Sequence, residues 1–232
     1  MPKCFLAACL VLAVGWSAAD ASAAIVQSTA AAPARVDLTA EGTADWAQYS
    51  YSSGLITVSK AAGTDLGALQ LIGSRSDGSY TASTAFDWTD GDSPATGAGV
   101  TSGASDNTWG GDLLRLTVHA DTQQRDLALY LMRANGVITV TATLSDDPGN
   151  PSTYSYPGTG YAMLQSRHLI SFAASSADQT LTVVVSGGDA PQYVTPAAGL
   201  SAATVQVIPE PASLALAALG AALLGARRRV AR

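Results

Sequence analysis

Between residues 36 and 207 the sequence repeats one pattern, in which short runs of alternating apolar and polar residues are separated by turns rich in Gly, Asn and Asp. Strict alternation places every second side chain on one face, as in a half-buried β-strand. The most helix-like stretch, 61–71, contains Gly63 and Gly67, and interior glycine weakens a helix. The pattern therefore predicts an all-β domain, a jelly-roll-like antiparallel β-sandwich of about eight strands without crossover helices.

Three stretches predict which side chains face the core. Alternation over 112–120, 168–174 and 180–186 turns one apolar set inward in each strand, namely Leu114, Leu116 and Val118, then Ile170 and Phe172, then Leu181, Val183 and Val185. Further strands are expected at 36–39, 55–59, 80–88 and 204–208.

A hairpin is predicted around Asn135-Gly136. The runs 125–133 and 137–146 both alternate, and Asn-Gly is the dipeptide that best suits a two-residue hairpin, because both of its residues accept a positive φ. We therefore expect these two runs to pair with each other.

The first 23 residues predict a signal peptide. One positive residue, Lys3, precedes an apolar run from Cys4 to Trp16, and Ala21-Ser22-Ala23 fits the small-x-small cleavage pattern. We place the cut after Ala23, since the apolar run is shorter than the ~20 residues of a transmembrane helix. The alternative is lipidation at Cys9 after Leu6-Ala7-Ala8, which would leave almost no apolar region ahead of it. The Ala-, Ser- and Thr-rich residues 24–35 are expected to be a linker.

The last 25 residues, 208–232, have a different organisation. Pro209-Glu210-Pro211 is followed by an apolar run over 212–226 and then by Arg227-Arg228-Arg229. The two prolines favour an extended peptide, and the apolar run predicts a short transmembrane helix of about 22 Å. Basic residues stay on the cytoplasmic side, so the Pro-Glu-Pro segment is expected outside. A plain single-span anchor is the alternative interpretation.

This order of motifs over the last 24 or so residues resembles the PEP-CTERM sorting tail. The resemblance implies that Pro209, Glu210, Pro211 and the arginines 227–229 are recognised and processed by exosortase, a membrane Cys protease-transpeptidase, in a bacterium that makes exopolysaccharide and biofilm. The expected partners are then the Sec translocon, signal peptidase and exosortase. The precursor would be anchored in the inner membrane and the product would lie at the cell surface or outside the cell.

Charge and cysteine content exclude some functions for residues 24–207, the part of the chain between the two targeting segments, which we call the body. Without the two ends the chain loses five of 12 Lys and Arg and two of 18 Asp and Glu, which leaves a net charge of −9. This excess of negative charge argues against nucleic acid as a partner, because binding to phosphates depends on Lys and Arg. Both cysteines, Cys4 and Cys9, lie in the signal peptide, so the mature protein has no thiol nucleophile and no disulfide.

The body also resembles a bacterial accessory domain similar to the galactose-binding-like jelly rolls found beside carbohydrate-active enzymes. The motifs that carry this resemblance are Asp37–Ala47, Phe86–Gly91, Leu127–Tyr130, Thr141–Asp146 and Gln179–Val183. It covers most of 36–207 and implies a sandwich fold and a structural calcium.

Aromatic residues are the first candidates for a ligand site, because flat sugar faces stack on Trp and Tyr. Trp109 lies in a polar loop beside Asp106 and Asn107, which is what a sugar site needs, although packing against the end of the sandwich would also explain it. Tyr154 and Tyr156 lie in a predicted loop and suggest a second platform, although a long surface loop would also explain them. Trp46, Phe86 and Trp88 are expected in the core, since the last two share a strand face.

Carboxylates are the second candidates. Asp87, Asp90 and Asp92 cluster in a Gly-containing loop, which suits calcium, while turn capping by Asx side chains is the alternative. No Gly-x-Ser-x-Gly elbow or His-Glu-x-x-His motif is present, and nothing singles out an acid and base pair.

These observations predict an exported, exosortase-sorted envelope or matrix protein whose non-catalytic sandwich binds glycan, and the resemblance adds a structural calcium. Exopolysaccharide is the expected ligand. The alternatives are a structural or adhesion protein of the matrix without a sugar site, and an enzyme acting on exopolysaccharide.

Overall fold

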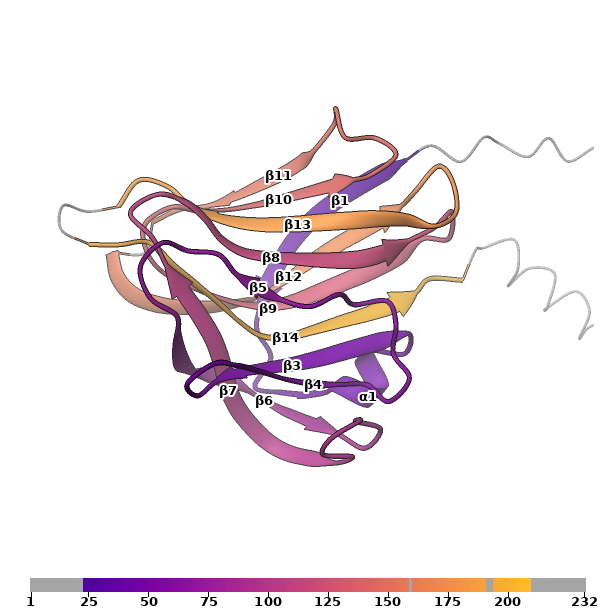
Figure 1. Cartoon of the computed structure of the whole chain (residues 1–232), viewed down its shortest axis with the longest axis horizontal. Helices are drawn as coiled ribbons and strands as arrows, with labels where there is room; N and C mark the ends of the chain where they lie inside the picture. The colour runs from indigo at the N-terminus through magenta and orange to yellow at the C-terminus, as the bar shows by residue number, and fades with distance from the viewer. Residues whose placement is uncertain (1–22, 159, 191–193, 210–232) are drawn as a thin grey trace, which may run out of the picture.

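The computed structural model describes residues 23–158, 160–190 and 194–209, and almost all of them lie in or between β-strands (Figure 1). Residues 1–22 of the predicted signal peptide, including its cleavage residue Ala21, lie outside the described residues, as do the span 212–226 and most of the sorting motif. Within the described residues, no helix is long and apolar enough to cross a membrane. The elements are β1 (Ala24–Ala31), β2 (Arg35–Asp37), α1 (Leu38–Glu41), β3 (Asp45–Tyr51), β4 (Leu55–Ser59), β5 (Gln70–Leu71), β6 (Gly78–Trp88), β7 (Gly97–Asn107), β8 (Gly111–Ala120), β9 (Arg125–Asn135), β10 (Ile138–Leu144), β11 (Ser152–Tyr156), β12 (Gly160–Ala173), β13 (Gln179–Gly187) and β14 (Ala197–Val207).

The described strands form two sheets. The larger has nine strands in the order β1-β12-β9-β14-β7-β6-β2, with β3 and β4 branching from β14, and the smaller has five in the order β11-β10-β13-β8-β5. Apolar side chains from both sheets meet in one core, as in a β-sandwich. The predicted inward sets of β8, β12 and β13 are confirmed, since all eight of these side chains are buried.

A second core lies on the outer face of the larger sheet. Strands β6 and β7 curve away below β14 (Figure 1) and enclose the buried side chains of Trp46, Phe86 and Trp88. Strand β9 serves both cores, because Leu127, Leu129 and Leu131 face the sandwich while Tyr130 and Met132 face the second core. The prediction that Trp46, Phe86 and Trp88 belong to the core is confirmed, with exposed fractions of 0%, 0% and 3%.

The predicted hairpin around Asn135-Gly136 is wrong. β9 lies in the nine-stranded sheet and β10 in the five-stranded sheet, so the turn carries the chain from one sheet to the other. Asn135 has the expected positive φ of 71°, but the backbone N–H of Val137 donates to Asp189 O at 2.8 Å and does not bond back to β9. Gly136 is not among the glycines with a positive φ, so the two-residue hairpin turn does not form, and contacts distant in sequence determine the partner strands.

The predicted linker over 24–35 is also wrong. Residues 24–31 form β1, which pairs antiparallel with β12 from Ala24 opposite Ala173 to Ala31 opposite Ser166. Residues 35–37 form β2, which runs parallel to β6. Backbone hydrogen bonds hold β1 in place, and these do not depend on the small side chains that suggested a linker. Among the described residues the first strand therefore begins at Ala24, within the stretch that was expected to be a linker.

Five connections cross between the two sheets at one end of the molecule, which we call the crossover end. They join β5 to β6, β7 to β8, β9 to β10, β11 to β12 and β13 to β14, over residues 72–77, 108–110, 136–137, 157–159 and 188–196, of which 159 and 191–193 are not described. The start of β1 and the end of β14 lie at the opposite end (Figure 1).

Candidate ligand-binding surface

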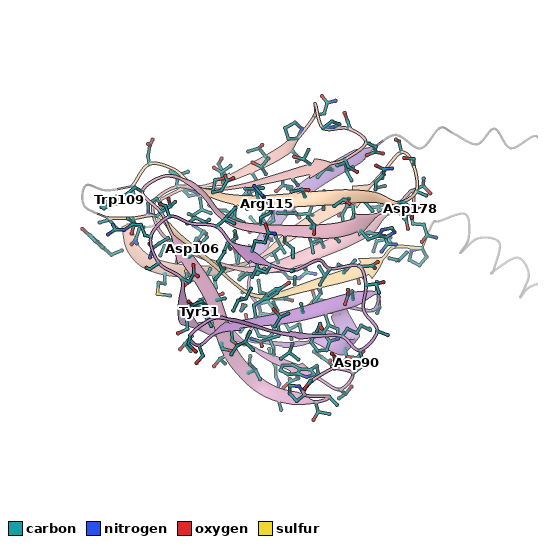
Figure 2. The ribbon with its side chains drawn as sticks, viewed as in Figure 1. Tyr51, Asp90, Asp106, Trp109, Arg115 and Asp178 are labelled. Carbon is teal, nitrogen blue, oxygen red and sulfur yellow. The ribbon has the colours of Figure 1, made fainter. Side chains whose placement is uncertain are left out.

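Trp109 lies on the connection from β7 to β8, at the crossover end (Figure 2). Its side chain is 62% exposed. The guanidinium carbon of Arg75, from the connection between β5 and β6, lies 4.4 Å from the ring centroid, which is the geometry of a cation–π contact. The structure thus places an indole in solvent, as the ligand-site prediction requires, and adds an arginine that the sequence reasoning did not single out.

Other apolar side chains are exposed at the same end. Of the six large hydrophobic side chains that the described residues expose, four lie there: Trp109, and Tyr161, Met163 and Leu164 at the start of β12. Tyr161 is the most exposed, at 78%. Exposed apolar groups that gather in one region are typical of a surface used for binding.

Thr108 fixes the backbone beneath Trp109. Its hydroxyl donates to Gly110 O at 2.9 Å and lies 2.9 Å from Ser74 Oγ, and its backbone N–H donates to Pro196 O at 3.2 Å. Gly111 has a φ of +106°, a conformation that favours glycine. Three crossover connections therefore meet at Thr108, so Trp109 projects from a well-connected turn.

Asp106 does not face a ligand, contrary to the prediction. It is 1% exposed, and its carboxylate accepts the backbone N–H of Gly73 and, at 2.7 Å, that of Asn107. Burial raises the pKa of Asp106. Asn107 is half-buried, donates from Nδ2 to Ser76 Oγ at 3.1 Å and accepts from Arg75 N–H at 3.3 Å. Both residues position the loop that carries Arg75.

We expect Asp106→Asn to lower the free energy of unfolding by about 1–3 kcal/mol, the cost of leaving a buried polar group unsatisfied. Both carboxylate oxygens accept from backbone N–H groups, whereas an asparagine must turn its NH₂ toward one of them. Urea unfolding measures the change. Asp77→Asn, at a nearby exposed carboxylate, is the matched control and should not destabilise. Equal stability of the two variants would contradict the role given to Asp106.

The predicted tyrosine platform is also placed differently. Tyr154 and Tyr156 lie on β11 and not in a loop, and Tyr156 is 3% exposed. Its hydroxyl lies 2.7 Å from His168 Nδ1, and His168 Nε2 lies 2.8 Å from Gln27 Oε1. Tyr154 packs edge-on against the rings of Tyr156 and His168. This buried network joins β1, β11 and β12 and closes one side of the sandwich, so Tyr156 is not available to a ligand.

His168 makes stability depend on pH. Burial lowers its pKa from 6.5 to about 4. Between these values the unfolded chain binds a proton that the folded protein does not, so stability falls as the pH drops below 6.5 and the loss is complete below 4. From pH 7 to pH 5 we expect His168 to account for a loss of about 2 kcal/mol.

The matched variant is His168→Gln, which keeps hydrogen-bonding groups but does not titrate. Urea unfolding at pH 7 and pH 5 should show a smaller loss for the variant than for the natural protein. An identical pH dependence in both would show that His168 is not held neutral.

The structure does not bring the three predicted calcium ligands together. Asp87 pairs with Arg35, whose hydrogen bond lowers the pKa of Asp87. Asp90 accepts from Trp46 Nε1 at 2.9 Å and pairs with Lys60 at 3.2 Å. Asp92 is exposed. Among the described residues no group of three or more His, Cys, Asp or Glu is arranged to hold a metal, so a structural calcium stays a prediction of the resemblance.

Comparison with known proteins gives a family match for the C-terminal tail and a match among solved structures for the folded part of the chain. No curated protein matches the chain. TmCBM61, solved in complex with β-1,4-galactotriose, aligns over 60% of this chain and 88% of its own, with 12% identity and a TM-score of 0.38. The family model for the PEP-CTERM protein-sorting motif matches residues 207–229. The chain thus carries a PEP-CTERM sorting motif directly after the last strand of its β-sandwich.

Proposed function

We propose that the protein is exported, held in the inner membrane by its C-terminal tail and then processed by exosortase for the cell surface or the extracellular matrix. The match of residues 207–229 to the sorting motif supports this, as does the signal-peptide pattern over residues 1–23. Signal peptidase would cut after Ala23, and the first strand begins at Ala24. Both targeting segments therefore adjoin the folded body directly.

The two ends of the sandwich would then have different surroundings. Strand β14 begins beside the end of β7, close to Trp109, and ends at Val207, where the sorting motif starts. Eleven residues of strand span roughly 35 Å. A precursor anchored through its tail would present the crossover end away from the membrane.

We further propose that the sandwich is a non-catalytic glycan-binding domain and that Trp109 is its main contact. The observation that carries this is an indole 62% exposed on a turn tied to two neighbouring connections. Rigid exposed aromatics lose little conformational entropy on binding and suit the CH-bearing faces of sugars. The alternative is a structural matrix protein without a sugar site, which is favoured by the contact that Arg75 already makes with the ring.

The binding proposal is tested with the processed protein and a glycan panel that includes the producer's exopolysaccharide, with and without calcium. Calorimetric titration should detect binding that Trp109→Ala removes and Trp109→Phe partly keeps. Binding that survives Trp109→Ala would place the site elsewhere, and no binding to any glycan would favour the structural alternative.

The sorting proposal has a separate test in the producing bacterium. Replacing Pro209, Glu210 and Pro211 by alanine should make the uncleaved precursor accumulate in the membrane fraction, as seen by immunoblot. Normal processing of this variant would contradict the role of the motif.

A further inference from the structure

The basic residues of the body divide into two groups. Five of the seven Lys and Arg among the described residues pair with a carboxylate: Arg35 with Asp87, Lys60 with Asp90, Arg115 with Asp112, Arg125 with Asp65 and Asp121, and Arg167 with Glu41. Within the described residues the remaining two, Arg75 and Arg133, have no ion pair. In a body with a net charge of −9, unpaired cations are unexpected.

Both unpaired arginines lie at the crossover end, and both stack on an aromatic ring. The guanidinium of Arg75 is 4.4 Å from the Trp109 centroid, and that of Arg133 is 4.5 Å from the Tyr156 centroid. Arg133 also donates to Pro157 O at 3.4 Å, while its Nε is buried without a hydrogen-bond partner. Stacking holds each guanidinium in place and leaves hydrogen-bond donors for an incoming acceptor.

Neighbouring strands place the two positions close together. Asp106 and Arg133 both lie opposite Ala198, one on each side of β14. Two strand spacings separate these backbones by about 10 Å, and Trp109 follows three residues after Asp106. One extended polymer lying across the crossover end would meet Trp109 and Arg75 together, and Arg133 near them.

We propose that the glycan bound at this end is acidic, with a uronate-type carboxylate received by Arg75 beside a sugar ring stacked on Trp109. The proposal rests on the glycan-binding function above and names its ligand class. Arginine binds carboxylates through two parallel hydrogen bonds, and Arg75 is the more exposed of the two described cations that have no carboxylate partner. Arg133 supplies a second, weaker contact.

An exposed carboxylate near Arg75, that of Asp77, would repel an acidic glycan. It lies near enough to Asp106 that its charge raises the pKa of that residue, and it follows Arg75 by two positions. Removing this charge with Asp77→Asn should tighten the binding of an acidic glycan about two- to fivefold, the size of a partly screened surface interaction. The same substitution should not affect a neutral glycan.

The test compares one oligosaccharide in two forms, oligogalacturonate and the same chain after reduction of its carboxyl groups. The protein used is the full chain, exported and processed in its host. It should bind the acidic form about 10- to 100-fold more tightly, the range for hydrogen bonds to charged groups. Added NaCl should weaken that binding. Arg75→Gln should abolish the preference for the acidic form, whereas Trp109→Ala should weaken the binding of both forms.

Arg35→Gln is the matched control, because Arg35 is exposed but already paired with Asp87, and it should leave both affinities unchanged. Equal binding of the two forms, unaffected by Arg75→Gln, would overturn this inference while the glycan-binding function stood. A preference for the acidic form that survives Arg75→Gln would also overturn it. Failure to bind either form or any glycan of the panel would count against the proposed function itself.

Discussion

Arg125→Ala should lower the free energy of unfolding by about 3–5 kcal/mol, as expected when one partner of a buried ion pair is removed. Arg125 is 6% exposed at the start of β9. Its guanidinium donates to Asp65 at 2.6 Å and to Asp121 at 2.7 Å. The substitution leaves two partly buried carboxylates, 17% and 22% exposed, without their cation. It also separates β9 from the connection that precedes β5 and from the turn after β8.

Urea unfolding followed by circular dichroism measures this effect. Arg35→Ala is the control, since the Arg35 side chain is 66% exposed in its pair with Asp87 and exposed pairs contribute little to stability. Its unfolding midpoint should match that of the natural protein. Equal midpoints for Arg125→Ala and Arg35→Ala would show that the ion pairs of Arg125 do not stabilise the fold.

Trp46→Ala should cost a similar amount, about 3–5 kcal/mol, because it removes a large side chain from a packed core. Trp46 is fully buried, its ring centroid lies 5.6 Å from that of Trp88, and its Nε1 donates to Asp90. The variant opens a cavity in the second core and leaves Asp90 with one donor fewer. Thermal unfolding should show the loss.

Trp109→Ala is the matched control for this prediction. The indole is exposed, so its removal should leave the unfolding free energy almost unchanged while it abolishes glycan binding. Comparison of the two variants therefore distinguishes a tryptophan that stabilises the fold from one that binds ligand. A large loss of stability in Trp109→Ala would instead indicate that this ring packs on the sandwich and serves the fold.

Alternation predicted those strands that have one buried and one solvated face. β8, β12 and β13 are of this kind, and their inward residues were predicted correctly. In β9 the alternation over 125–133 agrees with the inward-facing Leu127, Leu129 and Leu131. It does not indicate the burial of Tyr130 and Met132, because the second core on the outer face is built by β6 and β7. A local pattern does not report a layer contributed by distant residues.

Strand pairing was predicted less well than strand existence. Asn135-Gly136 has the local signal of a hairpin, yet β9 pairs with β12 and β14, and β10 pairs with β11 and β13. β1 lacks a clear apolar alternation, so its composition indicated a linker. Its place at the sheet edge depends on β12, more than 130 residues away in sequence.

Of the residues at the candidate site, the sequence predicted the exposure of Trp109 but neither the burial of Asp106 nor the part played by Arg75. The polar loop around Trp109 pointed correctly to an exposed ring. Asp106 is buried because the backbone of Gly73 approaches it from a segment 33 residues away, which no local pattern reveals. Arg75 could have been noticed as the single cation in a Gly- and Ser-rich stretch. Its contact with Trp109 could not, because two separate connections come together only in the folded chain.

Tryptophan fluorescence offers the most direct test that Trp109 forms the glycan-binding surface. Trp46 and Trp88 are buried and Trp109 is exposed, so acrylamide should quench mainly the emission of Trp109 in the processed protein. Loss of the quenchable emission in Trp109→Phe would verify this assignment. At a glycan concentration that saturates binding by calorimetry, the account predicts that this emission becomes protected from acrylamide. Unchanged quenching with glycan bound would place the ligand away from Trp109 and contradict the account.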